Sequence, residues 1–99
     1  MREIKELSDE MKEELEGAKC YAKLYVNYKS SNPSLAKKYY EMANDELKHA
    51  NYLHEMAVEK INKVKEENLS FPEYMEMIWK DKHDAYIDEM ANIKVILAM

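Results

Sequence analysis

The chain has 99 residues, with one glycine, two prolines and a formal net charge of −5 at pH 7. This length supports one small domain, and the acidic balance argues against a nucleic-acid-binding surface. A lone Cys20 excludes an intrachain disulfide, and the absence of a long apolar run or a signal-peptide core predicts a cytoplasmic protein without a membrane span.

Two proline-containing breaks divide the chain into three predicted helices. At the first break, Asn32 is placed to cap a helix that begins at Pro33. At the second, Ser70 and Glu73 have the spacing of a capping box. The connections are short, so neighbouring helices should run antiparallel. The predicted helices span residues 3–29, 33–67 and 71–97 of a single domain over residues 1–99.

The helix predicted over residues 3–29 carries an apolar stripe at alternating steps of three and four residues, a pattern typical of a helix packed on one face. Its members are Ile4, Leu7, Met11, Glu14, Ala18, Tyr21, Tyr25 and Tyr28. Glu14 is the one charged residue among them. Because a buried carboxylate is costly without a partner, Glu14 is a candidate ligand.

The helix predicted over residues 33–67 has a similar stripe, interrupted by Glu46 and His49. The stripe consists of Leu35, Tyr39, Met42, Glu46, His49, Leu53 and Met56. The carboxylate and the imidazole are three residues apart, so they project from the same helix face. A metal ion would satisfy both, because it binds a deprotonated carboxylate together with a neutral imidazole.

A second apolar stripe lies beside the first on the same helix. It consists of Ala36, Tyr40, Ala43, Leu47, Ala50, His54, Ala57, Ile61 and Val64. A helix that is apolar over such a wide arc packs against two neighbours. Three helices leave part of this arc uncovered within one chain, so we expect a homo-oligomer, at least a dimer. His54 should face another helix, away from His49.

The helix predicted over residues 71–97 carries one titratable imidazole in its stripe. The stripe consists of Trp79, His83, Tyr86, Met90, Ile93 and Leu97. His83 is a weaker candidate ligand, with a core histidine as the alternative. Lys80 stands where a second Glu-x-x-His would need a glutamate, which argues against an internally duplicated site. Glu16, at the edge of the first stripe, is another weaker candidate.

Glu14, Glu46 and His49 together form half of a known ligand set. Di-iron and di-manganese bundles use one Glu from each of two helices and a Glu-x-x-His from each of the other two, so two copies of the chain would supply the whole set. Oxygen-rich ligation suits Fe or Mn, and a structural Zn site is a further possibility. The alternative is a buried polar network of Glu14, His49 and tyrosine hydroxyls, without metal.

Two segments resemble the ferritin-like superfamily, in particular its rubrerythrin and encapsulated-ferritin branches. In the first helix of that family a ligand Glu is followed seven residues later by Tyr, as Glu14 is by Tyr21. In its second helix the pattern is Ala-x-x-Glu-x-x-His-Ala, as in Ala43 to Ala50. The resemblance covers residues 7–57, and no Cys-x-x-Cys module accompanies it.

The resemblance implies an all-α fold, a three-helix antiparallel ferritin-like half-bundle completed by dimerisation. It also implies a di-iron site in which Glu46 bridges the metals and Glu14 and His49 are terminal ligands, with ferroxidase or peroxide-scavenging oxidoreductase activity. Fe is the expected cofactor, with Mn or Zn as alternatives. The competing interpretation is a non-catalytic helical structural or assembly module.

Overall fold

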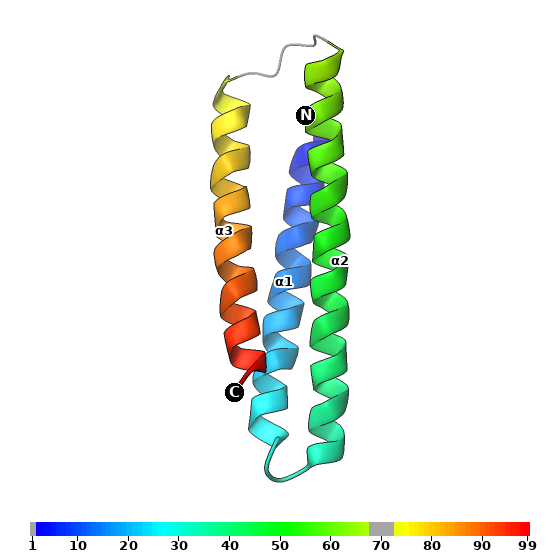
Figure 1. Cartoon of the computed structure of the whole chain (residues 1–99), viewed down its shortest axis with the longest axis vertical. Coiled ribbons are helices and arrows are strands. Elements are labelled where there is room, and N and C mark those ends of the chain that lie inside the picture. Colours follow the sequence, from blue (N-terminus) through cyan, green and yellow to red (C-terminus); the bar gives the residue numbers. More distant parts are fainter. Residues whose placement is uncertain (1, 68–72) are drawn as a thin grey trace.

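The computed structural model describes residues 2–67 and 73–99, and within them the chain forms three helices and no strands. These are α1 (Arg2–Tyr28), α2 (Pro33–Glu66) and α3 (Glu73–Leu97). The molecule is elongated, 56 × 17 × 17 Å, and α2 runs opposite to α1 and α3 (Figure 1). The all-α class is therefore confirmed, with consecutive helices antiparallel as expected.

The turn between α1 and α2 is fixed by the predicted cap. The Leu35 backbone N–H donates to Asn32 Oδ1 at 3.2 Å, and Pro33 occupies the first turn of α2. A cap of this kind contributes about 1 kcal/mol to helix stability. The second predicted cap involves Ser70, which lies outside the described residues.

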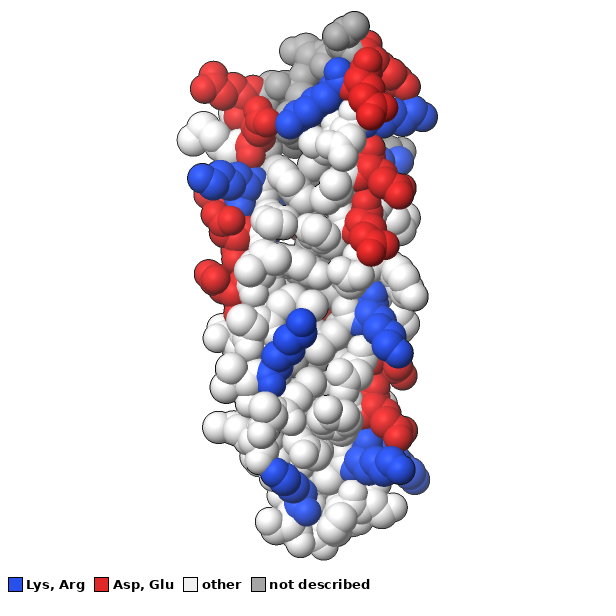
Figure 2. Space-filling view, in the orientation of Figure 1, with Lys and Arg blue, Asp and Glu red and all other residues white. Residues whose placement is uncertain are grey.

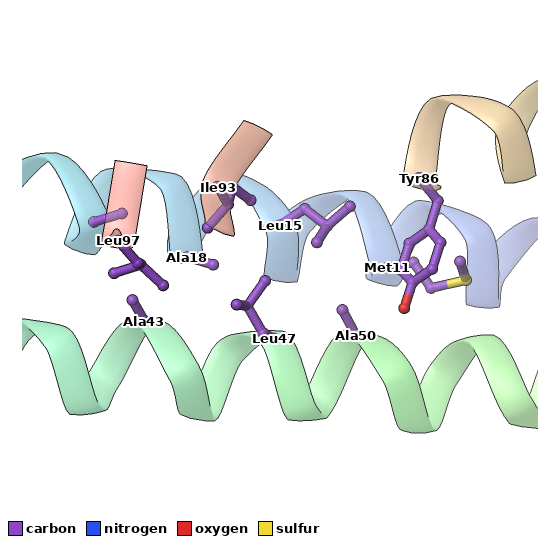
Figure 3. Packing of buried hydrophobic residues seen from close by; sticks show 10 residues of the cluster. Met11, Leu15, Ala18, Ala43, Leu47, Ala50, Tyr86, Ile93 and Leu97 are labelled. Carbon is purple, nitrogen blue, oxygen red and sulfur yellow. The ribbon is translucent and has the colours of Figure 1, made fainter. Parts of the chain in front are cut away.

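The core between α1 and α2 is built from small residues. Ala18 and Ala22 of α1 and Ala43 and Ala50 of α2 have no exposed surface. Side chains this short let two helices approach closely. Larger apolar side chains from all three helices surround them (Figure 3). The larger members of this cluster are Met11, Leu15, Leu47, Tyr86, Ile93 and Leu97.

The stripe that contains Glu46 and His49 borders this core and does not form it. Met42 and Met56, on the same stripe, are 40% and 47% exposed, whereas Ala43 and Leu47 of the neighbouring stripe are buried. Within one chain, Glu46 is therefore half-buried and His49 exposed, at the edge of the core. The reason is steric, because the short side chains of the alanine stripe let α1 and α2 come close together. The bulkier side chains of the stripe that contains Glu46 and His49 would hold the two helices further apart.

Helix α3 packs mainly against α1 and meets α2 through a cluster of rings. The His54 ring of α2 stacks on Tyr86 of α3 with a centroid distance of 4.9 Å and an interplanar angle of 3°. The centroid of the His83 ring lies 4.9 Å from that of the His54 ring. Lys65 and Glu76 join the two helices near the α2–α3 connection at 2.8 Å. His54 thus faces another helix, as expected.

Much apolar surface stays exposed. Figure 2 shows one face on which uncharged residues form a broad area between charged edges, crossed in its lower half by basic side chains. On α3, Tyr74, Met77 and Val95 are each more than 60% exposed. None of the helices, within the residues that the structure describes, is apolar over a stretch long enough for membrane crossing.

Candidate metal centre

One glutamate of α1 and a glutamate and a histidine of α2 converge at the edge of the α1–α2 contact. Each of Glu14, Glu46 and His49 offers one ligand atom, and these atoms all lie within 4.8 Å of one another. His49 Nδ1 lies 3.5 Å from Glu14 Oε2 and 4.0 Å from Glu46 Oε1. The helical hairpin places the two glutamates side by side, since Glu14 lies 14 residues before the end of α1 at Tyr28 and Glu46 lies 13 residues after the start of α2 at Pro33.

The site is closed on the side of the helices and open on the other. The side chains of Glu14 and Glu46 are 29% and 27% exposed, and that of His49 is 55% exposed. Glu14 Oε2 itself is buried and has no hydrogen-bond partner among the described residues. A buried carboxylate oxygen without a donor is destabilising, and a cation bound between these side chains would compensate for the missing donor.

The Glu46 carboxyl group holds its proton more tightly than an isolated glutamate does. The pKa of Glu46 is raised to about 7, first because its protonated form hydrogen-bonds to Glu14, then through partial burial and the negative charge of Glu14. The charge of His49 opposes this rise. A divalent cation would offset the negative charge of Glu14 that disfavours the ionised form of Glu46, so the site would be stabilised by such an ion.

The donor set fits half of a di-iron carboxylate site. Two carboxylates and one imidazole suit Fe or Mn, and they are half of the two-Glu, two-Glu-x-x-His set of bundle sites. Among the described residues this is the one group of three or more His, Cys, Asp or Glu residues close enough to hold a metal. The exposed imidazole leaves the open side free for further ligands.

The two weaker candidates lie elsewhere. Glu16 is exposed and lines a groove of about 380 Å³ between α1 and α3, together with Leu15 and Lys19. His83 packs against His54 and Trp79. The structure therefore brings neither residue to Glu14, Glu46 and His49.

A glycine that the sequence analysis did not single out lies against the site. A Cβ atom at Gly17 would stand 3.2 Å from Glu46 Oε2. The sequence feature that could have drawn attention to Gly17 is that the single glycine of the chain lies inside a helix.

Comparison with protein-family models gives a match to the model described as Rubrerythrin over residues 5–95. The match includes all three site residues and extends through most of α3, beyond the residues 7–57 that carried the resemblance. No curated protein and no solved structure gives a match.

Proposed function

The chain belongs to the rubrerythrin family, and on this premise we propose that it is a di-iron carboxylate oxidoreductase whose metal site is shared between two copies of the chain. Its activity would be of the ferroxidase or peroxide-scavenging type. The observation that supports this most directly is the convergence of Glu14, Glu46 and His49 within 4.8 Å. Members of this family typically bind iron.

The shared site is supported by what one chain lacks. A single copy supplies two carboxylates and one imidazole, whereas a bundle di-iron site uses twice that number. Met42 and Met56 lie on the site stripe on either side of Glu46 and His49 and are half-exposed. Apolar side chains around an open polar site are what a second copy would cover.

Glu14, Glu46 and His49 would hold the iron together, because their ligand atoms lie within 4.8 Å of one another. The resemblance to ferritin-like proteins implies the roles, with Glu46 as the bridging carboxylate and Glu14 and His49 as terminal ligands. His49 directs Nδ1 toward both carboxylates. Bound iron would supply one-electron redox chemistry toward dioxygen or peroxide.

Proton release should accompany loading. The pKa of Glu46 is raised to about 7, so a large fraction of this carboxyl group is protonated at neutral pH in the metal-free protein. A metal ligand must be deprotonated. Iron binding should therefore release a proton from Glu46 and weaken as the pH falls below 7.

Replacing Glu46 by Ala tests the proposal. Anaerobic Fe(II) titration followed by native mass spectrometry should show loss of stoichiometric iron in this variant, with helical content unchanged by circular dichroism. Glu41→Ala is the matched control, because Glu41 is an exposed glutamate of the same helix. Equal iron loading of Glu46→Ala and the wild-type protein would refute the assignment.

One observation favours a second candidate, a structural module without catalysis. Glu14 Oε2 and His49 Nδ1 lie at ion-pair distance, 3.5 Å. If that contact serves stability alone, replacing Glu14 and His49 together by Leu should preserve or raise stability, and the wild-type protein should bind no iron.

A further inference from the structure

Gly17 occupies a position where a glycine is unfavourable by itself. It lies in the interior of α1, which spans Arg2–Tyr28. Glycine in a helix interior is about 1 kcal/mol less favourable than alanine. Its φ is outside the left-handed region, and the helix continues well past it, so neither backbone conformation nor helix termination requires glycine here.

Space explains the glycine. The three nearest atoms that a Cβ would meet all belong to Glu46, with Oε2 at 3.2 Å, Cδ at 3.7 Å and Cγ at 3.9 Å. The Glu46 side chain therefore lies across the surface of α1 that a side chain at position 17 would occupy. Gly17 follows Glu14 by three residues, so the two lie on adjacent turns of the same side of α1.

We propose that Gly17 is a positioning residue that leaves room for the Glu46 carboxylate to lie beside Glu14 and His49. The inference rests on the proposed function, since it concerns the same site. An added Cβ at 3.2 Å would require the carboxylate to move by a few tenths of an ångström. Metal–ligand distances tolerate deviations of only about 0.2 Å, so such a displacement should weaken metal binding.

The test separates the effect on the site from the effect on the helix. Gly17→Ala and Gly17→Ser both add a Cβ, and Cys20→Ala and Cys20→Ser are matched controls at an exposed position of the same helix. Each protein is titrated anaerobically with Fe(II), and its metal-free form is melted by circular dichroism. Two Gly17 variants are used so that failure of one to fold does not decide the outcome.

The expected result is a divergence of the two measurements. Gly17→Ala should melt at the same temperature as the wild-type protein or higher, because alanine favours the helix, yet bind Fe(II) about tenfold more weakly, a decrease of about 1.4 kcal/mol. Gly17→Ser should also bind more weakly, and both Cys20 variants should bind normally. Normal iron affinity in both Gly17 variants, with a wild-type protein that binds iron, would overturn this inference alone. A wild-type protein without iron would overturn the proposed function as well.

Discussion

Replacing Glu46 by Gln should stabilise the metal-free protein at pH 8 and leave its stability nearly unchanged at pH 4. The folded state raises the pKa of Glu46 from 4.5 to about 7. The folded protein therefore binds this proton more tightly than the unfolded chain does, and the wild-type protein loses stability as the pH rises from about 4.5 to 7. Glutamine does not ionise, so the variant escapes that loss.

The magnitude follows from the same pKa. At about 1.4 kcal/mol per pH unit, the interval from 4.5 to about 7 corresponds to roughly 3.5 kcal/mol as an upper limit. The Glu46 side chain keeps 27% exposure, and solvent screening reduces the effect, so we expect about 1–2 kcal/mol. For a domain of about this size, 1 kcal/mol corresponds to roughly 4–8 °C in melting temperature.

The assay is urea unfolding of the protein in a metal chelator, at one protein concentration so that association does not bias the comparison. Glu41→Gln is the control, because it removes a negative charge from an exposed position of the same helix. A Glu46→Gln variant that is no more stable than the wild-type protein at pH 8, or whose gain is the same at pH 4, would show that the two carboxylates do not repel each other as described.

Three further predictions concern the fold that holds the site. Leu47→Ala should destabilise by about 2–5 kcal/mol, because Leu47 is 6% exposed within the three-helix core; a loss below 1 kcal/mol in urea unfolding would contradict this packing. Asn32→Ala should cost about 1 kcal/mol by removing the acceptor for the Leu35 N–H, and an unchanged unfolding midpoint would refute the cap. Burial, and then the charge of His83, lowers the pKa of His54 below its usual 6.5, so the folded state disfavours its proton and stability should be lost as the pH falls below about 6.5. His54→Phe keeps a ring against Tyr86 and should lose less stability between pH 7 and 5 than the wild-type protein, as measured by thermal melting; parallel losses in the two proteins would exclude His54 as the group responsible.

The helices and their first turn could be predicted from local sequence signals. The position of Asn32 before Pro33 predicts where α2 begins, because a side-chain acceptor and a residue without an N–H both suit the first turn. The spacing of Glu46 and His49 likewise predicts a common face, since it depends only on helix geometry.

The choice of core stripe could not be predicted in this way. Both stripes of α2 are apolar at helical spacing, and periodicity alone does not rank them. The structure buries Ala43 and Ala50 because short side chains permit close helix contact, and it leaves Met42 and Met56 at the margin. Which stripe is buried depends also on the side chains of α1 that pack against α2, so it cannot be read from the sequence of α2 alone.

The contacts around the site could also not be predicted from the sequence, because they depend on how the helices pack. His83 interrupts an apolar stripe much as Glu14 does, yet it packs against His54 and Trp79, because the placement of α3 against α1 decides which stripe meets which. The contact between Gly17 and Glu46 joins residues on different helices, so no pattern along one helix could reveal it.

The most direct test of the shared metal site is native mass spectrometry of the full chain after anaerobic reconstitution with Fe(II). The proposed function predicts an even-numbered oligomer that carries two irons for each pair of chains, with the iron lost in Glu46→Ala. A monomer that binds its full complement of iron would contradict the sharing of the site between copies. An oligomer that binds no iron would contradict the metal site itself and leave Glu14, Glu46 and His49 as a polar network.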